Sequence, residues 1–580
     1  MDKFNGDFNA DDILKDFKAQ FKMPNKEEYA AVMKPTKRPM RVAISLLITA
    51  VISAIAYYFM LPALNLHSTD LYVFAILVIA IFLVTYLITC GLIGRPVYKE
   101  YAKASSKVPL ILVGVIILVM LVGYLTGATI FRARSYNQLM DVKQSDFNED
   151  FEEIGFSEVP RLDADSTKTL ADNKLNELSQ YVSQFLVADT TTQINYKGTP
   201  VRVAPLVYGD FFKWMNNTKN GLPAYMVINM VTQEVSVVQL ENGMRYSPSE
   251  LFNRRLERHL RFQYPTAIFD HSNFEIDDDG HPYWITASLT KKIGLFGGTD
   301  VKGAVITDAV TGESTYYNVE DVPNWVDRVY SDDLILEQYN YYGTLQKGFI
   351  NSVIGQKDVK ITSAGNGYIA MDDDVWVYTG VTSAGSDASN VGFILSNQRT
   401  KETRYYEIGG STETGAMQSA QGAVQNYGYR ASFPILLNVS GEPTYFMPLK
   451  DSSNMVKQYA MVNFKQRTVF GIGTSPEACS QSYTEALVAN NIVNPDNSSG
   501  GSDTDAGKHP EVTGAIQEIR TSVKDGNTYY YFKIDNKYYS ISANKNDEVV
   551  IFNVGDTVTA TYKEYEAENM IIPLNSIKLA

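Results

Sequence analysis

Three long runs of apolar residues stand out in the first quarter of the chain. They cover residues 42–64, 71–94 and 108–131, and none of them contains Asp, Glu, Lys or Arg. Each run is longer than the ~20 residues that a helix needs to cross a hydrocarbon core of about 30 Å. Because lipid offers no hydrogen-bond partner to backbone amides, each run must be helical to cross it. We therefore predict a membrane anchor of three transmembrane helices.

Basic residues next to these runs predict the sidedness of the anchor. Eight of them flank the N-terminal side of the first run or lie between the second and third: Lys34, Lys37, Arg38, Arg41, Arg95, Lys99, Lys103 and Lys107. Residues 65–70 contain no Lys or Arg, and only Arg132 and Arg134 follow the third run. By the positive-inside rule, we expect a plasma-membrane protein with a cytoplasmic tail (residues 1–41) and a large extracellular C-terminal region.

Two further patterns concern the tail and the spans. Asn9 precedes apolar residues at helical spacing that end before Pro24, which indicates either a helix on the inner membrane surface or a marginal helix in a disordered tail. Small residues recur every fourth position at Ser45, Thr49 and Ser53, and at Gly123 and Gly127. Such stripes let helices approach closely, either within this anchor or against another membrane protein.

After the spans, helical and strand patterns alternate. The sequence Ser247-Pro248-Ser249-Glu250 has the form of a capping box and predicts a helix over residues 249–262. Apolar spacing predicts further helices over 332–354 and 413–426, each followed by strand-like alternation. We expect four α+β modules, over residues 132–247, 248–330, 331–410 and 411–490.

A turn motif recurs between the predicted strands. It has Asp or Asn at the first position, Thr three residues later and Glu two residues after that, over residues 229–234, 308–313 and 397–402. A shortened form has only Asn463 and Thr468. A companion signal, Gly-x-Pro-x-aromatic, occurs over residues 221–225, 280–284 and 441–445. Since a short Asp or Asn side chain can cap the backbone of a turn, this pattern favours a structural turn over a binding site.

The run over residues 308–313, which closes a strand that follows a helix, resembles the small PepSY modules of bacterial envelope proteins. The Asn397 copy lacks the Gly-x-Pro signal, so the resemblance is clearest over residues 303–313. It implies non-catalytic α+β modules, which in some families regulate peptidases. It brings no catalytic residues with it.

The C-terminal part of the chain follows a segment rich in Ser, Gly and Asp. Residues 491–510 have the composition of a flexible linker. Residues 511–580 contain six short strand-like runs, which predict a small β-barrel similar to an OB-fold. That domain holds more acidic than basic residues, which disfavours the oligonucleotide binding common in this fold.

Charge and cysteine content narrow the possible functions. The chain has 51 Lys and Arg against 65 Asp and Glu. The acidic excess lies after residue 107, because residues 1–107 hold 13 basic and nine acidic side chains. An acidic surface argues against nucleic-acid binding. The two cysteines, Cys90 and Cys479, lie too far apart in the chain to form a disulfide framework, which is more typical of a bacterial envelope protein than of a eukaryotic ectodomain.

The candidate chemical groups are few. The five histidines (His67, His259, His271, His281 and His509) lack the spacing of a zinc site. Cys479 could act as a nucleophile with a distant histidine, although an isolated cysteine more often fills a core. The acidic triplets at 277–279 and 372–374 could bind calcium, but consecutive carboxylates point apart, which favours solvated turns.

From these patterns we predict a membrane-anchored extracellular binding or scaffold protein of the bacterial cell envelope. We expect no enzymatic activity, no catalytic, cofactor-binding or metal-binding residues, and no cofactor. We expect a protein partner in the membrane or envelope. The alternative prediction is a regulator or inhibitor of an envelope peptidase or cell-wall hydrolase.

Overall fold

The computed structural model describes residues 38–90, 93, 98–151, 159–371, 373–493, 511–524, 527–543, 546–562 and 571–579. The predicted helix before Pro24 lies outside the described residues, as does the predicted linker from residue 494 on. The chain divides into two compact units at residues 501 and 502, inside the predicted linker. The first unit contains the spans and a large domain, here called the globular domain (residues 129–493).

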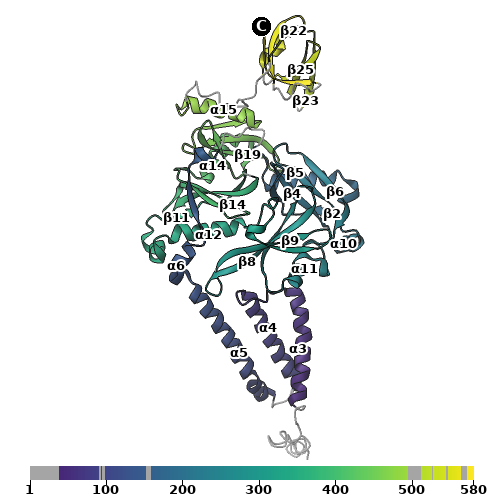
Figure 1. The fold of residues 1–580 in the computed structure, drawn as a ribbon, viewed down its shortest axis with the longest axis vertical. Helices are drawn as coiled ribbons and strands as arrows, with labels where there is room; N and C mark the ends of the chain where they lie inside the picture. Colours follow the sequence, from purple (N-terminus) through teal and green to yellow (C-terminus); the bar gives the residue numbers. More distant parts are fainter. Residues whose placement is uncertain are drawn as a thin grey trace, which may run out of the picture. The chain divides into compact units, whose positions relative to one another are not determined.

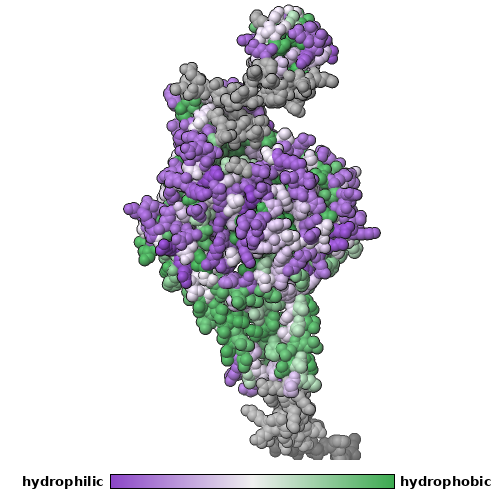
Figure 2. Space-filling view, viewed as in Figure 1, coloured by the Kyte–Doolittle hydropathy of each residue, from purple (hydrophilic) through white to green (hydrophobic). Residues whose placement is uncertain are grey.

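Three helices are long and apolar enough to cross a membrane: α3 (Arg38–Met60), α4 (Thr69–Ile88) and α5 (Tyr98–Gly127). Figure 1 shows them below the sheets, with α4 between α3 and α5, and Figure 2 shows their hydrophobic surface. The helix α5 begins ten residues before the predicted third span, because the polar segment that precedes Val108 continues the same helix. The prediction of three apolar helices is confirmed.

The small-residue stripe of the first span packs against the second span. The hydroxyl of Ser45 lies 2.9 Å from that of Thr89, and the hydroxyl of Thr49 lies 3.1 Å from that of Thr85. Hydroxyl pairs of this kind satisfy polar groups that lipid could not. This stripe therefore joins α3 to α4.

The glycine pair of the third span has a different neighbour from the one expected. A Cβ atom added at Gly123 would lie 2.7 Å from Phe296 and 2.8 Å from Leu295, at the tip of a β-hairpin of the globular domain. The Phe296 ring packs between Tyr72 of α4 and Tyr124 of α5, at centroid distances of 5.5 and 4.9 Å. Gly123 and Gly127 thus make room for this hairpin tip.

The end of α3 is joined to the globular domain by two buried arginines. Arg258 Nε donates to the carbonyl oxygen of Tyr58 at 3.1 Å, and Arg261 Nε donates to that of Leu61 at 3.0 Å. The last carbonyls of a helix have no partner within the helix, so these guanidinium groups act as its cap. The span and the domain are therefore held by directional hydrogen bonds.

The globular domain contains four antiparallel sheets, each built around a four-strand meander. The first consists of β3 (Thr192–Tyr196), β4 (Thr199–Tyr208), β5 (Leu222–Asn229) and β6 (Val235–Met244), with β2 (Phe185–Val187) beside β4. The second consists of β7 (Ile268–Ile276), β8 (Pro282–Ile293), β9 (Gly297–Asp308) and β10 (Ser314–Asn318). The third and fourth follow the same order.

The third meander contains β12 (Gly367–Met371), β13 (Asp374–Ser383), β14 (Ser386–Asn397) and β15 (Thr403–Tyr406), extended by β11 (Lys360–Thr362) and β16 (Gly410–Ser411). β1 (Val142–Ser145) adds to it in parallel, although it precedes the whole first sheet in the chain. The fourth contains β18 (Ile435–Val439), β19 (Glu442–Lys450), β20 (Val456–Asn463) and β21 (Phe470–Gly473), with β17 (Arg430–Ala431) beside β19.

The turn between the third and fourth strands of each meander has the same hydrogen bonds. One oxygen of the first side chain accepts the backbone N–H groups two and three residues later at Asn229, Asp308, Asn397 and Asn463. The backbone N–H one residue later donates to the carbonyl of Pro200, Pro282, Val375 and Pro443, respectively. The predicted role of these residues as turn caps is confirmed, and the fourth turn, at Asn463, is one residue longer than the others.

The four meanders also share the turn before their second strand. This turn shows that one of the three predicted copies of the Gly-x-Pro-x-aromatic signal does not match the others. In each sheet, the residue two positions before the accepting carbonyl has positive φ. These residues are, in sheet order, Gly198, Gly280, Asp373 and Gly441. The equivalent of Gly280-His281-Pro282 in the first sheet is therefore Gly198-Thr199-Pro200. The predicted copy over residues 221–225 lies instead at the start of β5.

Neighbouring sheets share their hydrophobic cores. Phe274 and Trp284 of the second sheet pack with the first sheet, whereas Ile285 and Ile306 of the second sheet pack with the third. The third and fourth sheets share another core, which contains Phe393 and Tyr445. The predicted modules are therefore joined into one body, because the inner sheets are covered on both faces.

Helices precede or flank the sheets. They are α6 (Thr129–Asn137), α7 (Phe147–Asp150), α8 (Ala164–Asn176), α9 (Ser179–Val182), α10 (Phe211–Asn217), η1 (Phe252–Arg254), α11 (Leu256–Gln263), η2 (Val319–Asp321), α12 (Asp332–Leu345), α13 (Gly348–Ile350), η3 (Asn351–Gly355), α14 (Glu413–Ala423), η4 (Gln425–Tyr427) and α15 (Pro476–Ala489). The helix predicted from residue 249 begins at Leu256. Glu250 is buried and accepts hydrogen bonds from Tyr208 and Trp214, so its carboxylate does not cap a helix.

The C-terminal unit is one six-stranded sheet around its own core. Its strands are β22 (Glu511–Ala515), β23 (Glu518–Lys524), β24 (Asn527–Ile534), β25 (Lys537–Ser542), β26 (Thr557–Tyr562) and β27 (Ile571–Leu579), with η6 (Asp547–Ile551) between β25 and β26. The predicted small β-barrel is not closed by strand pairing. The ladder runs from β22 to β23, and within the described residues no strand pairing joins these two edges. They follow each other in the chain, with only residues 516 and 517 between them.

The contact between α5 and the hairpin tip gives a direct test. Gly123→Val should push Leu295 and Phe296 out of place and destabilise the protein by about 1–3 kcal/mol, the usual cost of overpacking. Gly114→Val, in the same helix, should have little effect, because no atom lies within 4 Å of its added Cβ. Thermal unfolding in detergent would compare the two variants. Equal stability of both would contradict the assigned contact.

Candidate functional site

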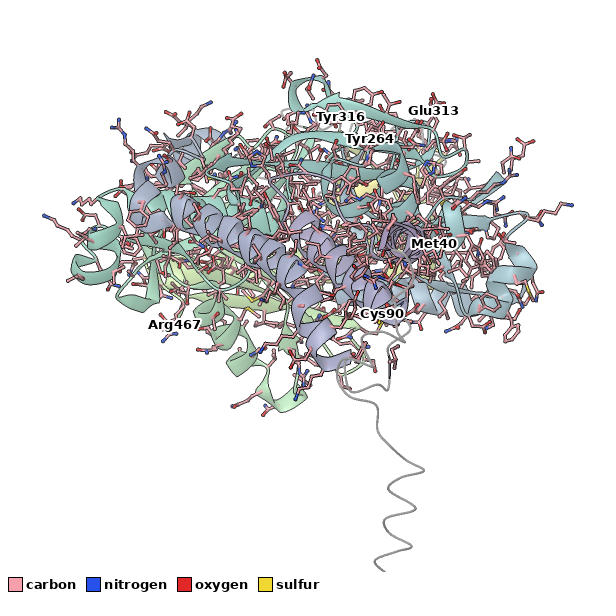
Figure 3. All side chains as sticks on the ribbon, turned by 90° about the horizontal axis from the view of Figure 1, so that it is seen from below. Met40, Cys90, Tyr264, Glu313, Tyr316 and Arg467 are labelled. Carbon is pink, nitrogen blue, oxygen red and sulfur yellow. The ribbon has the colours of Figure 1, made fainter. Side chains whose placement is uncertain are left out.

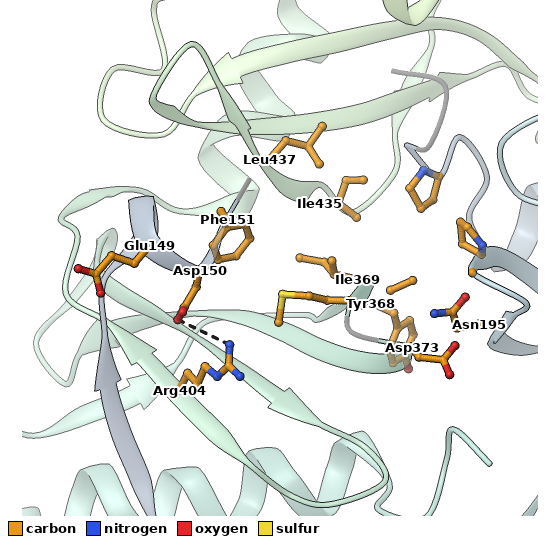
Figure 4. Close-up of a pocket in the computed structure, with 15 residues that line it drawn as sticks. Glu149, Asp150, Phe151, Asn195, Tyr368, Ile369, Asp373, Arg404, Ile435 and Leu437 are labelled. Carbon is orange, nitrogen blue, oxygen red and sulfur yellow. Dashed lines mark ion pairs between the residues drawn. The ribbon is translucent and has the colours of Figure 1, made fainter. Parts of the chain in front are cut away.

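An open cavity of about 600 Å³ lies where the first, third and fourth sheets meet (Figure 4). Four short segments of strand and turn form most of its wall. Its lining residues are Glu149, Asp150, Phe151, Pro160, Asn195, Gly198, Pro200, Tyr368, Ile369, Ala370, Met371, Asp373, Arg404, Ile435 and Leu437. Because these residues come from elements far apart in the chain, the cavity exists only when the sheets are packed together.

The cavity combines an apolar wall with carboxylates. Ile369, Ile435 and Leu437 form the apolar side (Figure 4); Ile435 is half-buried, and the other two are buried. Glu149 and Asp373 are exposed. Binding sites for small molecules and peptide segments commonly combine an apolar surface with a few placed polar groups. This composition suits a ligand with an apolar body and a positive charge.

One cation of the cavity is already paired. Arg404 lies 3.7 Å from Asp150 and 3.1 Å from Glu402, and its guanidinium stands 4.7 Å from the centre of the Trp376 ring. Asp150 also accepts a hydrogen bond from the hydroxyl of Tyr406 at 2.7 Å. Arg404 is therefore held in place as part of the wall.

A second cavity of about 230 Å³ shares Pro160, Tyr368 and Ile435 with the first. Arg202 lines it and, among the described residues, has no carboxylate within ion-pair distance; its partners are Thr191 and the side chain of Gln193. Burial lowers the pKa of Arg202 to about 10, and the nearby Arg328 acts in the same direction. Arg202 is thus a buried cation held mainly by neutral acceptors.

Two buried carboxylates lie behind this region and join the first sheet to the second. The oxygens of Glu275 accept the backbone N–H groups of Asp327 and Arg328 at 2.9 and 3.1 Å. Asp327 accepts the backbone N–H of Asn195, a cavity residue, at 2.7 Å. Burial raises the pKa of Glu275 to about 7 and raises that of Asp327 well above its usual value, with the charge of Glu275 adding to the effect on Asp327.

The structure also places the candidate residues of the sequence. Cys479 is buried in the core between α15 and the fourth sheet, and burial raises the pKa of its thiol to about 12. A thiol with so high a pKa is a poor nucleophile at neutral pH. Cys90 is buried at the end of the second span and donates to the carbonyl of Leu87.

The histidines are dispersed and have local partners. His67, His259, His271 and His281 contact the oxygens of Leu295, Gly312, Asp270 and Asp308, respectively; His509 lies outside the described residues. Within the described ranges, no three His, Cys, Asp or Glu side chains gather as metal ligands would.

The acidic triplets lie in turns. Asp277 accepts the backbone N–H groups of Asp279 and His281. Asp373 takes the positive-φ position that glycine occupies in the other sheets, and Asp374 forms an ion pair with Arg399 at 2.6 Å. Asp372 lies outside the described residues.

The main polar groups of this region were missed in the sequence. Glu275 lies between Phe274 and Ile276, and alternation along a strand by itself favours a solvent-facing position, whereas both faces of the second sheet are covered. A lone charge inside a continuous apolar run, such as Arg202 in β4, was a usable signal. No pattern in the sequence indicated that these groups lie together.

Comparison with protein-family models finds no match for this chain, and comparison with curated proteins finds none either.

The raised pKa of Glu275 predicts a pH dependence of stability. Its carboxyl is protonated more readily in the folded protein than in the unfolded chain, so its contribution is full below pH ~4.5 and is lost as pH rises through about 7. The loss should reach roughly 3 kcal/mol, from about 1.4 kcal/mol per pKa unit.

Urea unfolding between pH 5 and pH 8 would test this. Glu275→Gln stays neutral at every pH and should remove the part of the decline that belongs to Glu275, leaving the part that belongs to Asp327, whereas Glu234→Gln, at an exposed position, should leave the whole decline unchanged. If Glu275→Gln and the parent protein lose stability in parallel, the assignment to Glu275 is wrong.

Proposed function

We propose that this chain is a membrane-anchored binding protein of the bacterial cell envelope, with its globular domain outside the cell. The proposal rests on one observation: the cavity of about 600 Å³ lined by residues of three sheets, with an apolar wall and two exposed carboxylates. Its carboxylates lie beside apolar side chains, as in a site that binds a ligand with an apolar body and a positive charge. That composition supports a binding function.

The sidedness follows from charge. The basic residues beside the spans lie mainly on the side opposite to the globular domain, and the positive-inside rule places that side in the cytoplasm. The chemistry of the cavity favours a ligand with an apolar body and a cationic group, such as a basic segment of an envelope protein. Glu149 and Asp373 would attract the charge, and Ile435 and Leu437 would contact the apolar part.

We further propose that the four meanders are copies of one PepSY-like module. The matched turns at Asn229, Asp308, Asn397 and Asn463 support this, as do the positive-φ residues before the second strands. This gives some weight to a second candidate function, the regulation of an envelope peptidase or cell-wall hydrolase. In that case the bound partner would be the enzyme itself.

The binding function can be tested by photo-crosslinking in intact host cells. A photoreactive amino acid at Ile435 should crosslink to an envelope component, whereas the same group at the exposed Tyr427, outside the cavity, should not capture it. The double variant Glu149→Gln/Asp373→Asn should weaken that capture about tenfold, from ~0.5–1 kcal/mol for each lost charge.

The outcomes separate the two functions. A captured protein whose hydrolytic rate changes when the purified chain is added would favour regulation. Equal crosslinking from positions 435 and 427 would contradict a role for the cavity. Hydrolytic activity of the purified chain itself, abolished by one point mutation, would overturn both proposals.

A further inference from the structure

The exposed hydrophobic side chains of the globular domain gather beside the spans. Within described residues 129–493, every large hydrophobic side chain that is exposed belongs to one of two groups, except Tyr427. The α3-side surface consists of Val182, Leu186, Phe211, Phe212, Met215, Phe252 and Phe262. The α5-side surface consists of Ile130, Phe131, Ile350, Val353 and Ile354. Exposed apolar side chains gathered in this way indicate contact with another protein or with a membrane.

The α3-side surface is continuous with the end of the first span. The ring of Phe262 packs against Tyr57 and Tyr58 of α3, at centroid distances of 5.9 and 6.2 Å. In η1, the ring of Phe252 lies 5.7 Å from that of Trp214 in α10, and the Trp214 ring lies 5.7 Å from that of Phe211. Figure 1 shows α11 at the upper end of α3 and α10 beside it. A row of aromatic side chains therefore extends sideways from the point where α3 ends.

The α5-side surface begins in the same way at the third span. α5 ends at Gly127 and α6 begins at Thr129, so Ile130 and Phe131 directly follow the span. The short helix α13 contacts α6. Ile350 of α13 and Ile354 of η3 are among the most exposed hydrophobic side chains in the domain, at 74% and 81%. Figure 3, seen from the side of the spans, shows the span helices in front of this lower face of the domain.

The joint between spans and domain keeps both surfaces at the level of the membrane boundary. Arg258 and Arg261 bind the last carbonyls of α3, and the tip at Phe296 is held between α4 and α5. The domain cannot turn these surfaces away from the bilayer without breaking those contacts. Lys213 and Arg254 lie on the same elements as the α3-side aromatic residues and could meet lipid phosphates.

We propose that the α3-side and α5-side surfaces lie in the headgroup region of the adjacent leaflet, so that the globular domain rests on the membrane as well as being anchored in it. Aromatic and aliphatic side chains are favoured at this depth, where apolar groups leave water and nearby charges stay hydrated. The occupant of both surfaces is lipid. The proposal rests on the membrane anchoring in the proposed function and does not depend on the ligand of the cavity.

The test uses the full chain in nanodiscs of phosphatidylcholine and phosphatidylglycerol. Single cysteines at Met215 and Ile354 would carry a fluorophore, and lipids with a nitroxide near the headgroup would quench it; lipids with a nitroxide at the end of the acyl chain would quench a label at the middle of a span. The native Cys90 and Cys479 are buried, which limits unwanted labelling. Tyr427→Cys, exposed but outside both surfaces, is the matched control, and Leu118→Cys reports on the lipid-facing side of α5.

Labels at 215 and 354 should lose about half of their fluorescence to the headgroup nitroxide, because interfacial side chains lie ~5–10 Å into the boundary, and the label at 118 should lose about as much to the acyl-chain nitroxide, because it lies near the middle of the span. The label at 427 should be unaffected. If position 118 is quenched but 215 and 354 behave like 427, the lipid contact is overturned while the anchoring stands, and a protein would have to cover the surfaces. If position 118 is not quenched, the anchoring itself fails.

Discussion

The arrangement of this structure depends on how the backbone carbonyl groups find hydrogen-bond donors where the chain leaves the membrane. A span that ends at Met60 presents carbonyl groups that lipid cannot bind, and two arginines of α11 supply the donors. At the third span, glycines replace side chains so that the hairpin tip at Phe296 fits against the helix. These contacts couple the anchor to the second sheet directly, since α11 precedes that sheet and the hairpin belongs to it.

From the second sheet the packing extends in both directions along the chain. Its two faces contribute to two different cores, and the third and fourth sheets continue the same arrangement. The third and fourth strands of each meander are connected by the same turn, in which one side-chain oxygen accepts two backbone N–H groups. A simple local turn thus recurs while the surroundings of each sheet differ, and the cavity lies where three of these sheets fail to fill the space between them.

The buried charges occur at the contacts between sheets. Glu275 and Asp327 connect the second sheet to Asn195 of the first, and Arg202 lies close by with neutral partners. Removing charged groups from water is costly, and here burial shifts their pKa values toward the neutral forms. Such groups tie the stability of the sheet contacts to protonation.

The sequence by itself determined the local features of this protein. The absence of charge over long apolar runs predicts three helices that are long and apolar enough to cross a membrane, and Asp308 and its equivalents mark their turns because a short side chain bonds only to nearby backbone. The tertiary structure alone decided the rest. Glu250 is a buried hydrogen-bond acceptor instead of a helix cap. Gly123 packs against the tip of a hairpin instead of another helix. The edges of the C-terminal sheet are not joined by strand pairing. In each case the deciding partner lies far away in the chain, where residue spacing carries no information about it.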